Sequence, residues 1–173
     1  MHGTLDFMPR AKGEHESIFI NTFSASRGPG ELCLASALMG EIRPFDLSAH
    51  GLIMQANAFL ASDLSVNLDA KWQGLKGFTT EKGCKMMRAT GPGMAWLASC
   101  GAIVEKELKL GETVTVDAGH VLAFPDTMQF NVRKVANWTA PSTGGEGVVV
   151  DFYGPGRVGI QTRSPAGTAE TLK

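Results

Sequence analysis

The sequence predicts an all-β fold built from an internal repeat of about 63 residues, and three observations support this prediction. The tripeptide Gly-Pro-Gly occurs three times, at residues 28–30, 91–93 and 154–156, with a constant interval of 63 residues. A short apolar run precedes each tripeptide, and a second run follows it. Apolar and polar residues alternate in many other short segments, which is the period of a β-strand. A fixed interval of this length is typical of a duplicated supersecondary unit.

The three tripeptides are the residues to which we assign a structural role. Proline fixes φ near the value that the second position of a tight turn requires, and the following glycine can adopt positive φ. Each tripeptide is therefore predicted to join its flanking runs as an antiparallel hairpin. A phosphate-binding loop is the alternative, but neither Lys-Ser nor Lys-Thr follows any copy. The predicted turn residues are Gly28, Pro29, Gly30, Gly91, Pro92, Gly93, Gly154, Pro155 and Gly156.

The strands between these turns are predicted from the alternation of side chains. Period-two patterns occur at residues 64–69, 108–110, 113–117 and 130–132, and Val148–Val150 is apolar on both faces, as in a sandwiched strand. The Ala-rich segment 54–64 has helical propensity, but its repeat partner 121–124 stops at Pro125, so both are expected to be strands. We expect one domain over residues 1–163 and a flexible tail over residues 164–173.

Composition limits the functional classes. Sixteen basic and 17 acidic residues give a net charge of −1 over 173 residues, so a nucleic-acid or anionic-membrane partner is not expected. The sequence has no apolar run of about 18 residues and no secretory signal, which favours an intracellular protein, cytoplasmic in a prokaryote or mitochondrial in a eukaryote. Three cysteines without a Cys-x-x-Cys pair give no support for a zinc site, and Cys33 and Cys100 are expected to act as small apolar residues.

Two histidines are the weak candidates for a metal site. His50 and His120 each neighbour a glycine at matching places in two repeats, so they could meet near a shared axis and bind a metal or respond to pH. Duplication alone would also place similar residues at similar corners. The other histidines, His2 and His15, lie near the N-terminus, so no third ligand is evident. We therefore expect no metal or other cofactor.

Enzymatic constellations are weaker still. Asp117 and His120 could combine with Ser99 or Cys100 as orienting group, base and nucleophile, but no Gly-x-Ser-x-Gly nucleophile elbow is present. Cys84 lies beside Lys85, which could lower the pKa of the thiol. The alternative is a thiol near a turn with no function. The sequence therefore predicts a protein that is not an enzyme.

Aromatic and basic residues suggest one further possibility, which is RNA binding. The residues concerned are Trp72, Trp96, Trp138, Arg157 and Arg163. Bases can stack on such side chains. However, Trp96 lies inside a predicted repeat strand and is expected in the core, while Trp72 and Trp138 follow similar strands in two repeats. Architecture explains these positions better than RNA binding does.

Taken together, these segments resemble the altered inheritance of mitochondria protein 24 family, and the match extends from about residue 13 to residue 163. It rests on residues 17–23, 51–62, 91–101, 110–112, 116–120 and 154–163. The resemblance implies three β repeats around a pseudo-threefold axis, similar to the trp RNA-binding attenuation protein class and to a double-stranded β-helix. Fungal members of the family are linked to organisation of the mitochondrial inner membrane. The family implies no established reaction and no catalytic residues.

The first repeat is expected to be incomplete at its N-terminus. Sixty residues separate Gly30 from Gly91, but only 27 precede Gly28 and 17 follow Gly156, about 16 fewer in total. The missing part corresponds roughly to residues 44–60. We expect either an incomplete gene product or strands supplied by a neighbouring chain, because an open β edge favours pairing.

The function predicted from these features is that of a non-enzymatic β scaffold or protein-interaction module. Its turns and edge strands would form the contacts, with a homo-oligomer or another protein as the partner. A role in mitochondrial or membrane-associated organisation follows only from the family resemblance. The alternative is a cupin-like domain that binds a small molecule or a metal through His50 and His120, and RNA binding is the least favoured hypothesis.

Overall fold

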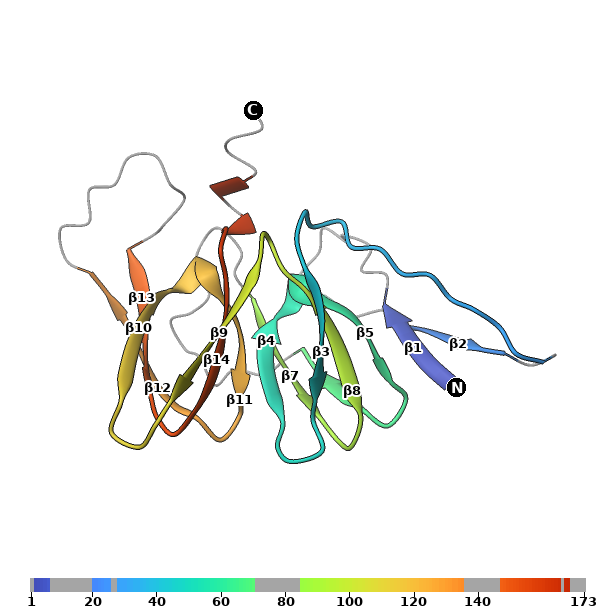
Figure 1. The fold of residues 1–173 in the computed structure, drawn as a ribbon, viewed down its shortest axis with the longest axis horizontal. Coiled ribbons are helices and arrows are strands. Elements are labelled where there is room, and N and C mark those ends of the chain that lie inside the picture. Colours follow the sequence, from blue (N-terminus) through green and yellow to red (C-terminus); the bar gives the residue numbers. More distant parts are fainter. Residues whose placement is uncertain are drawn as a thin grey trace.

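The structure is a computed structural model that describes residues 2–6, 20–25, 28–70, 85–135, 147–165 and 167–168. These residues form an all-β fold, as the alternation of the sequence predicts (Figure 1). Two short segments before the first complete module are strands β1 (His2–Asp6) and β2 (Ile20–Ser24). Among the described residues, no helix is long and apolar enough to cross a membrane.

Two successive segments of the chain have the same order of elements, and we call them the first module (residues 42–98) and the second module (residues 103–161). The first module contains β3 (Ile42–Asp46), β4 (Leu52–Gln55), the 3-10 turn η1 (Ala56–Ala58), β5 (Phe59–Asp63), β6 (Asn67–Asp69), β7 (Met86–Thr90) and β8 (Met94–Ala98). The second contains β9 (Ile103–Leu108), β10 (Thr113–Asp117), η2 (Ala118–His120), β11 (Val121–Pro125), β12 (Gln129–Lys134), β13 (Val148–Tyr153) and β14 (Gly156–Gln161).

The strands of the described residues form three sheets, and the six-stranded central sheet joins the modules. Its order is β6-β7-β4-β11-β14-β9, so three strands of the first module continue into three strands of the second through the antiparallel β4–β11 pair. A five-stranded sheet has the order β2-β1-β5-β8-β3, and a three-stranded sheet has the order β10-β13-β12. We call the β4–β11 pair the junction.

The core is divided by the central sheet. On β4, Ile53 belongs to the apolar cluster that includes β13 of the three-stranded sheet, whereas Leu52 and Met54 belong to the cluster that includes β8 of the five-stranded sheet. The two outer sheets therefore cover opposite faces of the central sheet. Both strands of the junction are buried on both faces, with burial over the whole of β4 and over the first four residues of β11.

The predicted Gly-Pro-Gly hairpins are wrong at residues 91–93 and 154–156. Strand β7 lies in the central sheet and β8 in the five-stranded sheet, while β13 lies in the three-stranded sheet and β14 in the central sheet. Each turn therefore takes the chain from one layer to another, because the flanking strands pack face to face instead of pairing. The positive φ expected after proline is present, at +145° for Gly93 and +152° for Gly156.

The first Gly-Pro-Gly copy is followed by a different structure. Residues 31–36 form no strand, and the large side chain of Leu32 is half exposed. Strands β8 and β14, which follow the second and third copies, each lie between two neighbouring strands of a sheet. Residues 31–36, which follow the first copy, belong to none of the sheets. Strand β1 nevertheless pairs with β5, as β4 pairs with the equivalent strand β11. The predicted threefold repeat is therefore not shown, and two modules are described.

Several local predictions also need correction. Leu64 and Ser65 lie in a turn between β5 and β6, and Leu110 is 84% exposed beyond the end of β9. The segment 54–64 is extended but is interrupted by η1. Val149 is only half buried, so β13 has one core face instead of two. The flexible tail predicted for residues 164–173 remains a prediction, and its described residue Thr168 has a contact with the body, with Oγ1 3.2 Å from Cys100 Sγ.

Candidate functional site

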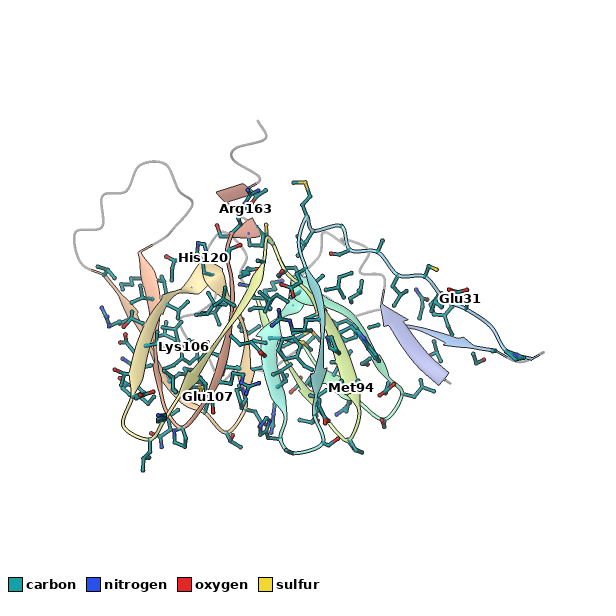
Figure 2. The ribbon with its side chains drawn as sticks, in the orientation of Figure 1. Glu31, Met94, Lys106, Glu107, His120 and Arg163 are labelled. Carbon is teal, nitrogen blue, oxygen red and sulfur yellow. The ribbon has the colours of Figure 1, made fainter. Side chains whose placement is uncertain are left out.

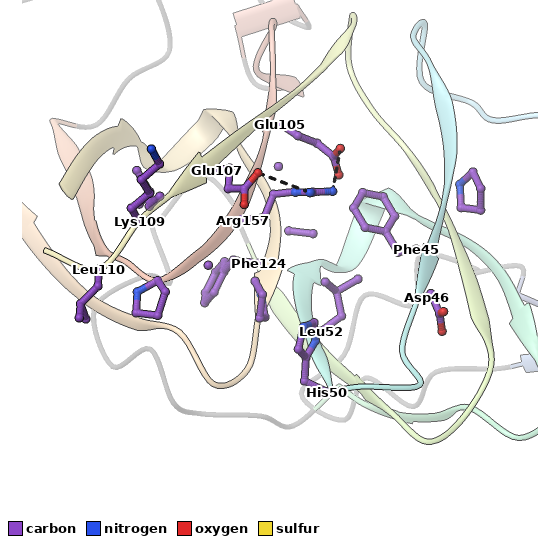
Figure 3. Close-up of a pocket in the computed structure, with 17 residues that line it drawn as sticks. Phe45, Asp46, His50, Leu52, Glu105, Glu107, Lys109, Leu110, Phe124 and Arg157 are labelled. Carbon is purple, nitrogen blue, oxygen red and sulfur yellow. Dashed lines mark ion pairs between the residues drawn. The ribbon is translucent and has the colours of Figure 1, made fainter. Parts of the chain in front are cut away.

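A groove of about 720 Å³ lies between β3 of the first module and β9, β11 and β14 of the second (Figure 3). Its apolar lining includes Phe45, Leu52, Phe124 and Pro125, and charged side chains of β9 and β14 stand beside it. The groove forms because the five-stranded sheet ends at β3, so it covers the first module's half of the central sheet and leaves the second module's half open on that face.

One wall of the groove is an open strand edge. Ala102 accepts a backbone hydrogen bond from Thr162 on the β14 side, at 3.0 Å. Since backbone groups alternate along a strand, those of Ile103, Glu105 and Glu107 point away from β14. β9 is the last strand of the central sheet, so no other described strand pairs with this edge. The edge thus carries unpaired backbone groups in the groove, where an extended chain could bind them.

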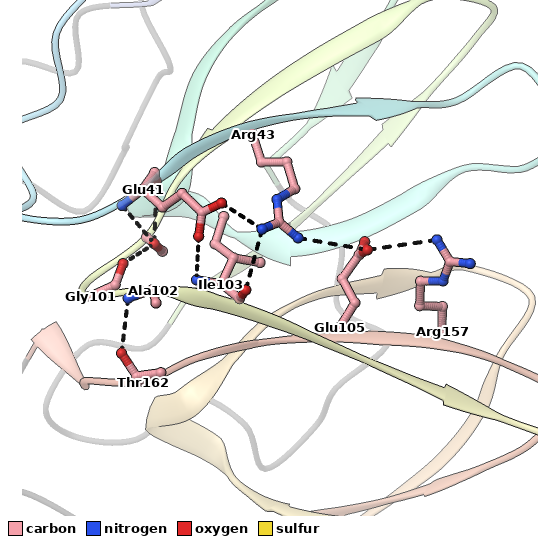
Figure 4. Close-up of polar contacts among 9 residues, drawn as sticks. Glu41, Arg43, Gly101, Ala102, Ile103, Glu105, Arg157 and Thr162 are labelled. Atoms are coloured by element: carbon pink, nitrogen blue, oxygen red, sulfur yellow. Dashed lines mark hydrogen bonds and ion pairs between the residues drawn. The ribbon is translucent and has the colours of Figure 1, made fainter.

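The upper end of this edge is closed by two side chains, one from the residue just before β3 and one from β3 itself (Figure 4). The N–H of Ile103 donates to Glu41 Oε2 at 2.8 Å, and Arg43 Nη2 donates to the carbonyl of Ile103 at 3.4 Å. We call these two residues, together with Ile103, the clasp. The hydrogen bond from Ile103, followed by the one from Arg43, lowers the pKa of the Glu41 carboxyl. The clasp substitutes for strand pairing at Ile103 and leaves the groups of Glu105 and Glu107 open.

A chain of charged side chains continues from the clasp along the rim. Arg43 and Arg157 each approach Glu105 at 3.7 Å, and Arg157 also approaches Glu107 at 3.7 Å. Figure 3 shows Arg157 beside both carboxylates, and Figure 4 shows Glu105 between Arg43 and Arg157. At such distances, in half-exposed positions, the pairs contribute little to stability. Their effect is to neutralise the acidic side chains next to the open backbone edge.

The open edge of the facing strand β3 is interrupted at its centre. Glu41 exchanges backbone hydrogen bonds with Ser99 and Gly101, so Glu41, Arg43 and Phe45 turn their backbone groups toward β8. The next outward residue is Pro44, which has no N–H to donate. A proline is tolerated on an edge strand because it loses no ladder hydrogen bond there. The two walls of the groove therefore differ, and β9 is the one suited to receive a strand.

The structure separates the two candidate histidines. His50 lies in the turn between β3 and β4 and lines the groove (Figure 3). His120 lies in η2, near Arg163 at the other end of the molecule (Figure 2), and its Nδ1 is 2.8 Å from the carbonyl oxygen of Gln161. The predicted equivalence of the two histidines is wrong. The turns η1 and η2 correspond, so the residue of the first module equivalent to His120 is Ala58 and not His50. Within the described residues, no group of three or more potential ligands could hold a metal.

The residues considered for catalysis each have a separate structural contact. Asp117 Oδ1 accepts from the N–H of Gly119 at 2.9 Å, and Ser99 Oγ donates to the carbonyl of Gly101 at 2.6 Å. The N–H of Cys100 donates to Gln161 Oε1 at 2.9 Å. These contacts hold the turn at η2 and the link between the modules. Cys84 lies outside the described residues.

The residues considered for RNA binding are also dispersed. Trp96 is half buried in β8, and Arg157 pairs with acidic residues of β9. Arg163 is exposed beyond β14, near the end of the molecule that carries His120 (Figure 2). Trp72 and Trp138 lie outside the described residues. Cys33, expected to act as a small apolar residue, is exposed, whereas Cys100 is buried.

A buried polar network at the junction escaped prediction from the sequence. The side chain of Gln161 donates to Gln55 Oε1 at 3.1 Å and to the carbonyl of Gly119 at 2.9 Å, and both glutamines are almost fully buried. Gln161 Oε1 accepts from Cys100, so its amide is satisfied on both sides. Buried polar groups are tolerated when they are hydrogen-bonded in this way. The two glutamines are 106 residues apart, and no local pattern connects them.

Known proteins resemble this chain over most of its length. An uncharacterized protein of Streptococcus pyogenes serotype M6, M6_Spy0233, is 32% identical over 160 residues, which are 91% of this chain and 64% of that protein. The crystal structure of the Streptococcus pyogenes protein SPYM3_0169 is similar with a TM-score of 0.66 and 29% identity, covering 80% of this chain and 61% of the other. The chain thus spans less than two thirds of each relative. Residues 2–163 match the family described as Mitochondrial biogenesis AIM24, and the chain belongs to that family.

Proposed function

We propose that this protein is a non-enzymatic scaffold that binds an extended segment of a partner protein in the groove between its modules. The partner segment would add to β9 as an antiparallel or parallel strand. The proposal rests mainly on the edge of β9. There the backbone groups of Glu105 and Glu107 point into the groove, and no described strand pairs with them. Strand addition is a common mode of peptide recognition, in which backbone hydrogen bonds give affinity and pockets give selectivity.

The surroundings of this edge specify the chemistry of the segment. Phe45 and Leu52 present apolar surface beside it, so the segment should place an apolar side chain against them. Arg157, together with Arg43, already offsets part of the negative charge of Glu105 and Glu107, so a strongly basic segment is not required. Proline at position 44 leaves no N–H at the central outward position of the opposite wall, so that wall competes less for the segment's carbonyl groups. The expected ligand is therefore a short, uncharged, extended peptide with alternating apolar residues.

The test begins with a displayed library of random linear peptides selected on the purified protein. Selected peptides should shift the amide signals of Glu105 and Glu107 in NMR titrations. Glu105→Pro, which removes one of the two open N–H groups, should weaken their binding by tenfold or more, as expected for loss of about 1.4 kcal/mol. Glu105→Gln is the matched control, because it removes the charge and retains the N–H. Equal binding to the proline variant, or shifts confined to other strands, would refute the proposal.

A small-molecule site in the same groove is the second candidate. It is favoured by the volume of the groove, which falls in the range of ligand pockets, and by His50 and Asp46 in its lining. A cupin-like metal site would require further ligands in addition to His50. Elemental analysis of the purified protein distinguishes these functions. A stoichiometric metal that is lost in His50→Ala would favour the metal-binding alternative over peptide binding.

Several wider aspects belong to this proposal. The family description suggests a role in mitochondrial or membrane-associated organisation, which a peptide-binding scaffold could exert by holding partner proteins. We keep the prediction of a third repeat and of an intracellular location, cytoplasmic or mitochondrial according to the source. RNA binding ranks lowest because the net charge is −1. A filter-binding assay at physiological salt that detected tight RNA binding would reverse this ranking.

A further inference from the structure

Strand β10 carries a second open edge, and its counterpart in the first module is covered. Leu52 pairs with Ala89 in the first module and Val114 pairs with Phe152 in the second, so β4 and β10 occupy the same place. The free side of β4 is covered by β11, with Phe124 opposite Ile53. β10 is the first strand of its sheet, and no described strand lies on its other side. The junction therefore shows that a module can extend its sheet at this position.

The outward backbone groups of β10 can be identified from the alternation of the strand. Glu112 accepts a hydrogen bond from Gly154 on the β13 side, at 2.9 Å. Thr113, Thr115 and Asp117 consequently direct their N–H and C=O groups away from β13. Natural edge strands are usually protected by proline, lysine or a bulge. β10 contains neither residue and pairs with β13 in continuous register, so none of these features protects its edge within the described part of the chain.

We propose that β10 pairs with β10 of a second copy of this chain, antiparallel and around a twofold axis at Thr115. Thr115 then lies opposite Thr115 of the second copy, and Thr113 lies opposite Asp117. This register uses all three outward residues, and each pair exchanges two backbone hydrogen bonds. The interface is isologous, as in most homodimers, and it creates a six-stranded sheet with the order β12-β13-β10-β10-β13-β12.

The exposed side chains are compatible with this register. Thr115 Oγ1 donates to Asp151 Oδ1 at 2.6 Å, and Arg133 Nε pairs with Asp151 Oδ2 at 2.7 Å. In the dimer the two Asp151 carboxylates would be three strand spacings apart, about 14 Å, which exceeds the screening length of about 8 Å at physiological ionic strength. No like charges would face each other directly, because threonine lies opposite threonine or aspartate.

The inner face of the strand gains apolar cover. Val116 is buried in the cluster of the second module, while Val114 packs against that cluster and is only half buried. In the proposed register Val114 lies opposite Val116 of the second copy. The two apolar clusters would therefore meet beneath the new strand pair, and Val114 would lose its contact with water. β-branched residues at directly opposed positions are favourable in antiparallel sheets.

The interface is tested by sedimentation equilibrium over a range of protein concentrations. Wild-type protein should approach twice its chain mass of 18.4 kDa at high concentration. Thr115→Lys retains the backbone N–H but places two ammonium groups opposite each other, and should weaken the dimer by about tenfold or more. Thr115→Pro, which removes the central N–H, should do the same. Glu105→Pro is the control and should leave the dimer unchanged, which separates this interface from the groove.

Cysteine crosslinking tests the register. In a chain with Cys33→Ser, Thr115→Cys should form an intermolecular disulfide under mild oxidation, because the two residues face each other across the axis. Thr113→Cys should not, because it faces Asp117. A monomer at all concentrations, or a dimer of unchanged affinity in both Thr115→Lys and Thr115→Pro, would overturn the proposal. Crosslinking through Thr113→Cys instead of Thr115→Cys would overturn the register.

Discussion

The edges of β4 and β10 occupy the same position in two modules, yet one is a covered junction and the other has no described strand beside it. Ile53 of β4 is 1% exposed, whereas the equivalent residue of β10 is the exposed Thr115. The residue that pairs with Ile53 is Arg88, and the residue that pairs with Thr115 is Asp151. The same backbone position can therefore belong to a sandwiched strand or to an edge, according to which side chains it carries.

The ion pairs next to these two edges also differ, since one joins the two modules and the other lies within one module. Arg88 reaches out of its own module to Asp126, which follows β11, with Arg88 Nε 2.9 Å from Asp126 Oδ2. Asp151 instead pairs with Arg133 of its own sheet. The first arrangement ties two modules together, while the second is closed within one module. At the junction, an apolar residue on the edge strand and a long basic residue on its neighbour are among the contacts that cover the edge.

Exchanging the two edge residues should give the largest effect. Ile53→Thr places a hydroxyl in a fully buried position and removes apolar volume, so it should lower the free energy of unfolding by about 2–4 kcal/mol. The reciprocal change Thr115→Ile loses only the exposed hydrogen bond to Asp151 and should alter stability by less than about 1 kcal/mol in dilute protein. Urea unfolding measures both. Similar losses from the two changes would mean that β4 and β10 do not differ in burial.

The Gly-Pro-Gly turns of the two modules should differ in their tolerance of a side chain. A Cβ at Gly93 would lie 2.8 Å from Ser65 Oγ and 3.0 Å from Asp63 Cβ, whereas at Gly156 the nearest atoms belong to the flexible side chain of Met128. Both glycines have positive φ, so either valine variant should lose about 1–3 kcal/mol through strain. Gly93→Val should lose more than Gly156→Val in thermal unfolding. An unchanged melting temperature for Gly93→Val would refute the turn assignment.

The ion pair at the junction should have a smaller effect. Asp126 is largely buried and Arg88 is partly exposed, so Arg88→Gln should cost about 1 kcal/mol. The matched change Arg133→Gln removes the more exposed pair of the second module and should have a smaller effect. A double-mutant cycle with Asp126→Asn measures the coupling at the junction. A coupling no larger than that of Arg133 with Asp151 would remove the distinction between the two pairs.

Acid should weaken contacts on both sides of the molecule. Hydrogen bonding lowers the pKa of Glu41 below its ordinary value of 4.5, and that of Asp151 below 3.8, chiefly through Ile103 and Arg133 respectively. A carboxyl with a lowered pKa stabilises the fold fully above its unfolded value, and this contribution is lost as pH falls through the folded value. Melting temperature should therefore fall below pH 4.5 in part through Glu41, and Glu41→Gln should flatten that decline. An unaltered pH profile in this variant would show that the clasp is not formed.

The sequence predicts where the strands lie better than it predicts which strands pair with one another. The alternation at Val114 and Val116 identifies both β10 and its core face, and the 63-residue interval places the turns at residues 91–93 and 154–156. The same pattern cannot tell whether consecutive strands pair or pack face to face, so the hairpins were wrongly predicted. Alternation depends on one strand and its two faces, whereas sheet membership depends on strands that are distant in sequence.

The candidate site depends almost wholly on such distant contacts. Glu41 and Ile103 are 62 residues apart, and neither residue type at its position indicates that the two are in contact. His50 and His120 stood out because each neighbours a glycine, but their interval of 70 residues differs from the repeat. Requiring candidates to follow the interval of the repeat would have rejected this pair. That rule would not have found Gln55 and Gln161, which meet only because the two modules share a sheet.

Amide hydrogen exchange at the two equivalent edges tests the two-module architecture most directly. The N–H of Ile53 faces β11 and that of Thr115 faces away from β13. In protein dilute enough to be monomeric, Ile53 should exchange only through unfolding of the junction, while Thr115 should exchange rapidly. Rapid exchange at Ile53, or equal protection of the two amides, would contradict the architecture.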